Sequence, residues 1–436
     1  MASSKGVSLT TSGAIGSSQK TSPVRATSSP IVSISIVLFE LQIYKKNVTE
    51  HIVRLASGRR LGEVELKRWL NDRLGSSRCI TCGLDSRVGG RKASGWTIKQ
   101  ARWRFETTRY AILNDNTMDA TASVIIPPSL KRGDKIAIAA PARKISAEEL
   151  KPALDLFGSW GLEVALPDHL FDTCNQFAGD DDTRAAVMQQ LLDAPEVKAI
   201  VCARGGYGTV RIVDRLDFSG FARNPKWIVG YSDITVLHSH IHRHLNVATL
   251  HATMPIDIPE GAAAEPCPAT ESLRRMLWGE TVQYRCGGHP LNRIGAATGQ
   301  LVGGNLSILY SLCGSGSDID TRGKILFIED LDEYLYHIDR MMMNLKRSGH
   351  LAGLAGLVVG RMSDMHDNAV PFGRTAEQIV SDAVAEYGYP VCFGFPAGHI
   401  GTENLALAMG QQVRLEVDGG SELLFLNQSP FGHYAD

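Results

Sequence analysis

Ser232 is the residue of this chain whose type and position most directly allow covalent chemistry. It lies in the segment 230–233 (Gly-Tyr-Ser-Asp), after an apolar run at 227–229 and before a helical pattern that begins near Ile234. A serine on a sharp turn between strand and helix presents its hydroxyl at the positive end of the helix. The G-x-S-x-G pattern is incomplete, because Ile234 replaces the second glycine. An ordinary helix N-cap at Ser232 or Asp233 therefore remains an alternative to a nucleophile.

A serine nucleophile needs a base that takes its proton and a third group that orients the base. Glu329 ends an apolar run at 324–328, and His399 follows another at 390–395. The order Ser232, Glu329, His399 matches the serine, acid, histidine order of α/β hydrolases. Other acids in the same turn compete for the orienting role: Asp330, Asp332 and Glu333. Spacing alone leaves the choice open.

Two glycine-rich turns allow either ligand binding or tight packing. Residues 204–208 (Arg-Gly-Gly-Tyr-Gly) follow a predicted strand at 199–203. Their backbone N–H groups could cradle a phosphate or donate to an oxyanion. The turn lacks G-x-G-x-x-G spacing, the chain contains no G-x-x-x-x-G-K-[ST], and we expect no cofactor. The second turn, Gly-Gly-Asn at 303–305, indicates close packing before a helix.

Two patterns resemble metal sites, but neither supplies a full set of ligands. The first is a histidine run made of His238, His240, His242 and His244. On a helix these residues form two i, i+4 pairs that point in different directions. The second, Cys79 and Cys82, is a C-x-x-C without a second such pair, whereas zinc sites usually have four ligands. We expect no metal, and we interpret the run as part of an amphipathic, partly exposed helix.

Short apolar runs alternate with helical patterns after residue 118. Predicted strands lie at 135–140, 163–166, 199–203 and 227–229. This alternation predicts an α/β fold with a mainly parallel sheet and helices on both of its faces. The eight cysteines are scattered, and we expect reduced, mostly buried thiols.

A second half begins after about residue 286. It contains a predicted helix at 334–349 with a methionine stripe, which we assign to core packing. The alternating segment 412–426 predicts an antiparallel hairpin that turns at Asp418 and Gly419.

The first 117 residues differ from the rest in net charge and in the periodicity of their apolar residues. They carry 19 Lys+Arg against 8 Asp+Glu, a net charge of +11, whereas the other 319 residues carry 26 against 38, a net of −12. They show little periodicity apart from a helical pattern at 63–74. The basic, Ser-rich start is similar to a transit peptide. We prefer the alternative of a disordered or non-native leader, with Met118 as the true start.

Seven segments follow one another between Val124 and about Glu422. They are VIIPPSLKRGD at 124–134, FAGDDDTR at 177–184, RGGYGT at 204–209, GYSDIT at 230–235, GGNL at 303–306, ILFIED at 325–330 and FPAGH at 395–399. Together they resemble the L,D-carboxypeptidases, serine peptidases also called muramoyltetrapeptide carboxypeptidases, whose family includes the microcin-immunity branch. Their order is more specific than any single motif.

The resemblance implies an N-terminal α/β domain at 118–286 with the nucleophile and a smaller C-terminal α/β domain at 287–436 with the acid and base. The active site then lies at the interface of the two. By resemblance, Ser232 is the nucleophile, Glu329 the orienting acid and His399 the base.

The resemblance also implies that the oxyanion is held by backbone N–H groups of Asp233 and of Gly205 or Gly206. Glu333 lies in the same acidic turn as Glu329 and remains an alternative for the orienting acid.

The expected function is release of terminal D-Ala from a murein tetrapeptide in cell-wall recycling. We expect a cytoplasmic homodimer without a nucleic-acid or membrane partner. One alternative is a microcin-immunity type peptidase or amidase that acts on peptidyl-nucleotides or related amides. A more distant one is a non-catalytic nucleotide- or sugar-binding module at a sheet switch point.

Overall fold

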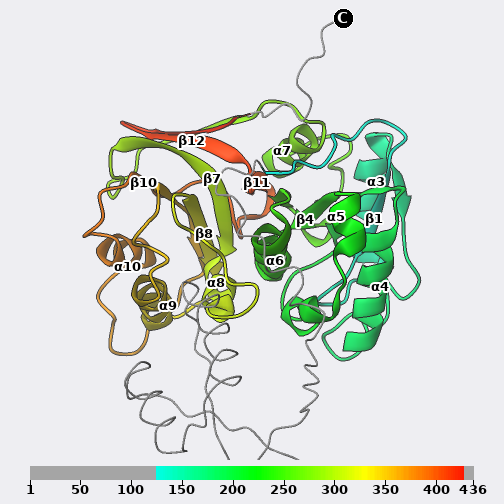
Figure 1. The fold of residues 1–436 in the computed structure, drawn as a ribbon, viewed down its shortest axis with the longest axis horizontal. Coiled ribbons are helices and arrows are strands. Elements are labelled where there is room, and N and C mark those ends of the chain that lie inside the picture. The colour runs from blue at the N-terminus through cyan, green and yellow to red at the C-terminus, as the bar shows by residue number, and fades with distance from the viewer. Residues whose placement is uncertain (1–123, 427–436) are drawn as a thin grey trace, which may run out of the picture. The chain divides into compact units, whose positions relative to one another are not determined.

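The computed structural model describes residues 124–426, which form two α/β lobes, each built on one sheet (Figure 1). The expectations for residues 1–117, including the leader, the helical pattern at 63–74 and the pair Cys79 and Cys82, lie outside the described residues. The strands span Lys135–Ala139 (β1), Glu163–Ala165 (β2), Val197–Cys202 (β3), Trp227–Gly230 (β4), Thr249–His251 (β5), Gln283–Cys286 (β6), Gly295–Asn305 (β7), Ile325–Leu331 (β8), Gly356–Ser363 (β9), Val391–Cys392 (β10), Leu407–Met409 (β11), Gln412–Val417 (β12) and Ser421–Phe425 (β13).

The helices alternate with these strands along much of the chain. The α-helices are Ala147–Ser159 (α3), Asp181–Asp193 (α4), Ser219–Arg223 (α5), Thr235–Leu245 (α6), Pro268–Leu277 (α7), Leu306–Leu312 (α8), Leu335–Arg347 (α9) and Ala376–Ala383 (α10). Short 3-10 turns are Thr209–Arg211 (η2), Val213–Arg215 (η3), Ser232–Ile234 (η4), Pro255–Asp257 (η5) and Gly401–Glu403 (η6).

The first sheet has the order β11-β5-β4-β3-β1-β2, parallel throughout except for β11. Alternate residues of β1 enter different cores. Ile136 and Ile138 pack in one core with Leu150 and Phe157 of α3, whereas Ala137 packs in another core that also contains buried residues of α4 and α6. Helices therefore cover both faces of this sheet. The predicted α/β class with a mainly parallel first sheet is confirmed.

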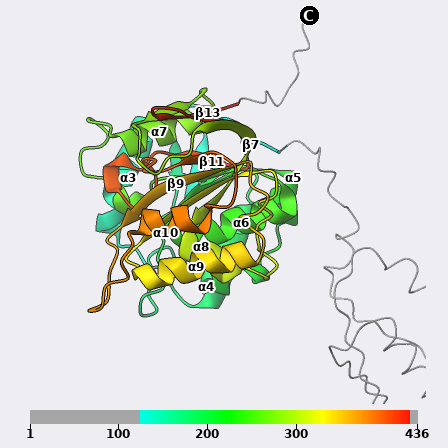
Figure 2. The same ribbon diagram turned by 90° about the vertical axis from the view of Figure 1, so that its left-hand side faces the viewer.

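The second sheet has the order β10-β9-β8-β7-β12-β13-β6. Strands β7 to β10 are parallel, and β12, β13 and β6 continue from β7 as antiparallel strands. Helices α8, α9 and α10 lie together against this sheet (Figure 2). Met341 and Met342 of α9 are fully buried among them, so the methionine stripe belongs to the core, as predicted. The hairpin is also confirmed, because β12 and β13 pair from Val413 to Val417.

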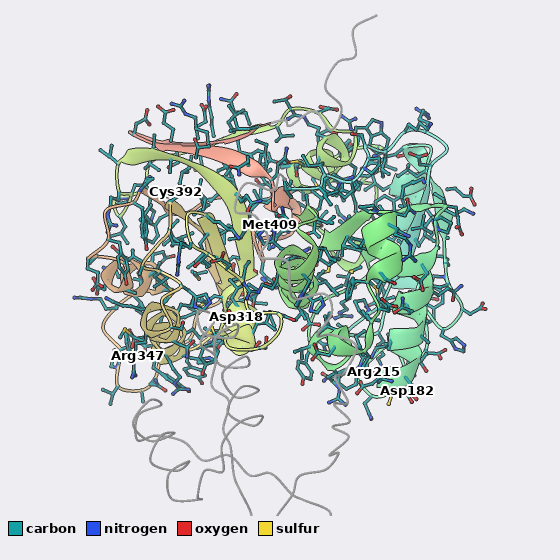
Figure 3. The ribbon with its side chains drawn as sticks, in the orientation of Figure 1. Asp182, Arg215, Asp318, Arg347, Cys392 and Met409 are labelled. Atoms are coloured by element: carbon teal, nitrogen blue, oxygen red, sulfur yellow. The ribbon has the colours of Figure 1, made fainter. Side chains whose placement is uncertain are left out.

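Each sheet includes one strand from beyond the boundary expected after residue 286. Strand β6 precedes that boundary but pairs with β13 of the second sheet. Strand β11 follows it but pairs antiparallel with β5 of the first sheet, with Met409 opposite Thr249. Met409 is buried between the lobes (Figure 3). Sequence order does not reveal this exchange, because it depends on which sheet edge each short strand meets.

The cysteines differ from the expectation of mostly buried thiols. Among residues 124–426, Cys202 and Cys392 are buried and Cys174 is exposed. The other three described cysteines are partly exposed: Cys267, Cys286 and Cys313. They lie at ends of helices or strands, where one side of the residue faces solvent. No helix within this described part is both long and apolar enough to span a membrane.

Candidate active site

Ser232 lies on a sharp turn between β4 and α6 and has a positive φ of 62°. A residue other than glycine rarely adopts this conformation, which costs about 1–3 kcal/mol and is found at strained catalytic turns. Gly230 opens the turn, where a Cβ would lie only 2.9 Å from Cγ1 of Ile234. The N-cap positions of η4 and α6 are Tyr231 and Ile234. The alternative that Ser232 or Asp233 is an ordinary N-cap is therefore wrong.

The Asp233 side chain points away from the helix and holds the glycine-rich turn. Its buried carboxylate accepts a hydrogen bond from the backbone N–H of Thr209, 2.9 Å away. Burial raises the pKa of Asp233, and the hydrogen bonds from Thr209 oppose that rise. Because Thr209 directly follows the turn at 204–208, this bond fixes the turn beside Ser232.

Gly205 of that turn packs directly against Ser232. A Cβ at Gly205 would lie 2.9 Å from the Ser232 Cβ and 3.1 Å from its Oγ, so a larger residue would displace the serine. Gly206 has a positive φ of 102°, and a Cβ there would clash with the Arg143 side chain at 2.0 Å. Both positions require glycine. At Gly205 the reason is the close approach to Ser232, and at Gly206 it is the positive φ together with the nearby Arg143 side chain.

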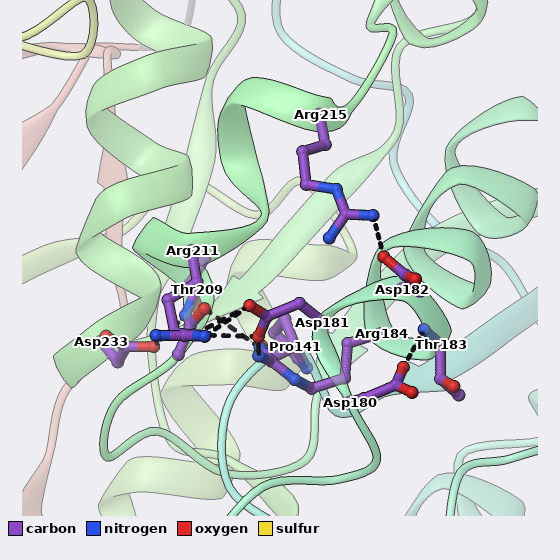
Figure 4. Close-up of polar contacts among 11 residues, drawn as sticks. Pro141, Asp180, Asp181, Asp182, Thr183, Arg184, Thr209, Arg211, Arg215 and Asp233 are labelled. Atoms are coloured by element: carbon purple, nitrogen blue, oxygen red, sulfur yellow. Dashed lines mark hydrogen bonds and ion pairs between the residues drawn. The ribbon is translucent and has the colours of Figure 1, made fainter.

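A buried arginine braces the same turn from the other side (Figure 4). The Arg184 guanidinium is 2% exposed and donates to the carbonyl oxygens of Pro141 and Gly208. It also pairs with Asp181, whose carboxylate accepts a second arginine, Arg211, at 2.9 Å. Sequence reasoning used the segment 177–184 only as a family resemblance. In the structure, Arg184 of this segment holds the glycine-rich turn next to Ser232.

Glu329, which lies within β8, and His399, which follows β10, form a close pair in the second lobe. The Nδ1 atom of His399 lies 2.7 Å from Oε2 of Glu329. The Glu329 side chain is fully buried and the His399 side chain is 14% exposed. Burial of His399 opposes its protonation, but the charge and the hydrogen bond of Glu329, together with the charges of Asp330 and Asp257, outweigh this effect and raise the pKa of His399. The arrangement orients the imidazole and stabilises its protonated form.

Neighbouring residues shape the space around the Glu329 carboxylate. A Cβ at Gly398, which has a φ of 114°, would lie 2.7 Å from Oε2 of Glu329. The side-chain amide of Asn305 donates to Oε1 of Glu329 at 3.3 Å and to Oδ1 of Asp330 at 2.9 Å. Sequence reasoning assigned residues 303–305 to packing and missed this role of Asn305. The only available signal was an asparagine directly before a helix, which also indicates a cap.

The other acids of the turn have different partners. Glu333 lies 2.5 Å from Nδ1 of His337, and Asp332 pairs with His366. Asp330 accepts the backbone N–H of Ser307 at 2.9 Å, and burial together with the charge of Glu329 raises the pKa of Asp330 to about 7. The geometry thus places Glu329, not Glu333, against His399.

The serine turn and the histidine meet where the lobes join. The ring of Tyr231, next to Ser232, lies 4.7 Å from the ring of His399. Across the same junction, the backbone N–H of Asn305 donates to Oγ1 of Thr235 at 3.0 Å, and a Cβ at Gly304 would lie 2.4 Å from that oxygen. Small residues at this contact let β7 approach the start of α6 closely.

Three further residues act near the pair: Asp257 and His251, which no sequence pattern indicated, and Arg204, which belongs to the glycine-rich turn. Asp257 is a largely buried carboxyl whose pKa is raised by burial and lowered in part by a hydrogen bond with Tyr231 and by the charge of His399. His251 is fully buried against Tyr231, and burial holds its pKa well below the ordinary value. Arg204 precedes Gly205, and its charge also acts on Asp257. Each lies far in sequence from the histidine, so only folding shows the proximity.

The histidine run is more buried than predicted. His238 and His242 are 2% and 7% exposed, and burial lowers their pKa values to about 4 and about 3. His240 and His244 instead bond to the loop after α8, at Oγ of Ser317 and the carbonyl of Gly316. The helix is less exposed than expected because it packs against β7 and α8 of the second lobe.

Comparisons with known proteins agree along the chain. Family models described as the LD-carboxypeptidase N-terminal domain and C-terminal domain match residues 136–252 and 298–415. A Bacillus subtilis protein named probable murein peptide carboxypeptidase is 39% identical over 297 residues, which cover 66% of this chain and 91% of the relative. The murein tetrapeptide carboxypeptidase of Pseudomonas aeruginosa is 29% identical over 293 residues, covering 65% of this chain and 93% of the relative.

Solved structures share the architecture. The muramoyltetrapeptide carboxypeptidase from Oxalobacter formigenes aligns with a TM-score of 0.62 and 27% identity, covering 67% of this chain and 99% of that one. The microcin C7 self immunity protein aligns with a TM-score of 0.61 and 20% identity, covering 70% of this chain and 99% of that one, a likeness of fold. Given the two matched domains and the relative at 39% identity, this chain belongs to the LD-carboxypeptidase family.

Proposed function

We propose that this chain is a serine-type L,D-carboxypeptidase that releases terminal D-Ala from a murein tetrapeptide. The observation that carries the proposal is the pair formed by His399 and the buried Glu329, next to the ring that adjoins the strained Ser232. Serine acyl transfer needs a histidine that a carboxylate orients and that can reach the serine hydroxyl, and the contact of His399 with Tyr231, the neighbour of Ser232, supports such a reach. The names of two relatives supply the substrate class.

In the proposed reaction, the Ser232 Oγ attacks the carbonyl carbon that joins the L-configured centre of a diamino acid to D-Ala. His399 takes the hydroxyl proton, and Glu329 stabilises the resulting imidazolium. The C–N bond then breaks, and D-Ala leaves with the proton from His399. A water molecule, deprotonated by His399, attacks the acyl-enzyme ester and restores the Ser232 hydroxyl.

The oxyanion of the tetrahedral intermediate would accept hydrogen bonds from the backbone N–H of Asp233 and from that of Gly205 or Gly206. Gly205 packs so closely against Ser232 that a Cβ at Gly205 would lie 3.1 Å from the Ser232 Oγ, and this proximity supports the assignment. Loss of one such donor typically reduces kcat by about 10²–10³-fold.

Arg204 would bind the free carboxylate of the terminal D-Ala. A carboxypeptidase must recognise the free carboxylate of the chain end, and a cation close to the nucleophile can supply that recognition. Arg204 directly precedes Gly205, and its charge reaches the buried Asp257 beside the site. Its ion pair with Glu149 is 3.5 Å long and partly exposed, so most of its N–H donors remain available for a carboxylate.

The protein would act as a cytoplasmic homodimer without a cofactor or a nucleic-acid or membrane partner. The six described cysteines are free thiols, which fits a reducing compartment. Light scattering of the purified chain would measure the dimer, and fractionation of the source cells would test the location.

Mass spectrometry of the full chain incubated with muramyl tetrapeptide tests the function, with Ser232→Ala as the control. We expect loss of one D-Ala with the wild-type chain alone. If neither chain trims the peptide while a serine-directed probe still labels Ser232, the substrate assignment is wrong and an immunity-type amide becomes the next substrate to assay. If both chains trim it equally, the serine mechanism is wrong.

A further inference from the structure

Three metal-ligating side chains converge in the second lobe, outside the candidate active site. Cys313 follows α8, Asp318 lies in the next loop (Figure 3) and His350 follows α9. The ligand atoms of these three residues all lie within 4.8 Å of one another. His350 lies far in sequence from Cys313 and Asp318, so only the packing of α8 against α9 brings it to them.

The hydrogen bonds around His350 aim one of its ring nitrogens at the Asp318 carboxylate. The Ser348 hydroxyl oxygen lies 2.7 Å from Nδ1 of His350 and also within hydrogen-bond distance of the carbonyl oxygens of Asn344 and Leu345, so it can hold the imidazole in place. The other ring nitrogen, Nε2, lies 2.8 Å from Oδ1 of Asp318. Asp318 therefore faces a ring nitrogen that can bind either a proton or a metal ion.

The chemistry of the three groups selects among metal ions. A thiolate, an imidazole and a carboxylate are a set typical of zinc, and the two negative charges of the ionised ligands balance the +2 charge of the ion. Tetrahedral zinc with ligand bonds of about 2.0–2.3 Å brings its ligand atoms to about 3.3–3.7 Å from one another. Atoms already within 4.8 Å reach this spacing with small side-chain movements, in which Nε2 of His350 and Oδ1 of Asp318 move apart from their present 2.8 Å. Ser348 would serve as the outer partner that orients the histidine, as zinc-bound histidines usually require.

We propose that Cys313, Asp318 and His350 form a zinc-binding site that ties the loop after α8 to the end of α9. The same loop receives His240 and His244 of α6, through Ser317 and Gly316. Since α6 begins directly after the Ser232 turn, the ion would hold the loop against the helix that supports the proposed nucleophile. The three protein ligands leave the fourth tetrahedral position to a water molecule, and the site takes a divalent metal that the sequence patterns did not indicate.

Cobalt(II) binding to the full chain tests the proposal, because a thiolate bond to cobalt gives charge-transfer absorption that zinc then abolishes by displacement. We expect one saturable band in the wild type and none in Cys313→Ser. Cys174→Ser changes an exposed cysteine elsewhere and should leave the band unchanged, as should the double change Cys79→Ser with Cys82→Ser. Ser348→Ala keeps all three ligands and should weaken cobalt affinity by about 10- to 100-fold.

Thermal unfolding supplies a readout that is independent of catalysis. Zinc should raise the Tm of the wild type and of Cys174→Ser but not that of Cys313→Ser. A band that persists in Cys313→Ser, or that disappears with the 79 and 82 double change, overturns the proposal. The absence of any saturable band in the wild type also overturns it, and the cluster is then an ion pair of His350 with Asp318. If Cys313→Ser fails to fold, Asp318→Asn decides, because it removes the carboxylate charge and should abolish or strongly weaken the band.

Discussion

The Nδ1 atom of His399 lies 2.7 Å from a carboxylate oxygen of Glu329, and the Glu329 side chain is fully buried. Burial of the imidazole lowers the pKa of His399, but the Glu329 carboxylate and other nearby acids raise it, and the net effect is a raised pKa. A general base must be neutral, so activity should rise with pH as His399 loses its proton.

Glu329→Gln should lower kcat by about 10³- to 10⁴-fold, because the amide can no longer stabilise the imidazolium or select the correct tautomer. In the plot of kcat/KM against pH, the rise on the acidic side should move to lower pH, because loss of the Glu329 charge lowers the pKa of His399. The pH dependence of kcat/KM measures this shift. Glu333→Gln is the matched control, because Glu333 contacts His337, and it should leave kcat within about threefold of wild type. The reverse ranking of the two variants would identify Glu333 as the orienting acid.

Ser232→Ala should remove nearly all release of D-Ala while the fold remains intact. The reason is that no acyl-enzyme can form without the hydroxyl. Ser239→Ala provides a control in the same helix, because Ser239 is also buried but lies two turns from the nucleophile. Initial rates and labelling by a serine-directed probe measure both variants. A Ser232→Ala rate above about a tenth of wild type contradicts the assignment.

Gly205→Ala should reduce kcat by at least about tenfold with a small change in KM, because the new Cβ would lie 2.9 Å from the Ser232 Cβ and displace the serine. Gly158→Ala is the control, since a Cβ at this position of α3 meets no atom within 4 Å. That control should retain full activity and gain about 0.5–1 kcal/mol in the free energy of unfolding. Steady-state kinetics and urea unfolding give the two readouts, and equal loss of activity in both variants would contradict the close-approach argument.

Arg204→Ala should raise KM for the tetrapeptide at least about tenfold, because the terminal carboxylate loses its charged partner. The effect should largely disappear when both proteins are assayed with a peptide whose C-terminal carboxylate is amidated. Arg275→Ala removes a surface arginine paired with Glu280 and should change KM neither for the free tetrapeptide nor for the amidated peptide. An equal loss with the free acid and the amide would show that Arg204 supports the loop instead of reading the carboxylate.

Thr235→Val tests the junction of the lobes. The change removes the oxygen that accepts the backbone N–H of Asn305, and a buried donor left without a partner costs about 1–3 kcal/mol of unfolding free energy. We expect kcat to fall as well, because α6 and β7 hold the proposed serine and acid in register. Thr235→Ser keeps the oxygen and should stay near wild type in both urea unfolding and kcat. A loss confined to Thr235→Ser would assign the effect to packing of the methyl group and would contradict the hydrogen-bond argument.

The sequence by itself determined the elements that depend on local patterns. The alternation at 412–426 predicted the hairpin, and the apolar runs at 135–140 and 199–203 predicted parallel strands, because side-chain periodicity follows directly from backbone geometry. The turn at Ser232 was also recognisable, since a strand, a glycine and a helix must meet there. These features can be predicted without knowing the contacts between residues that are far apart in the sequence.

Only the tertiary structure decided which acid meets His399. Four acids lie within five residues, and the register shift between Ile328 and Asp330 in the pairing of β8 with β9 changes the directions of their side chains. The partners of Glu329 come from β7 and from the segment after β10, far away in the chain. The exchange of β6 and β11 and the meeting of Cys313 with His350 have the same origin. Each depends on contacts between residues that are far apart in the sequence, and local residue patterns do not predict such contacts.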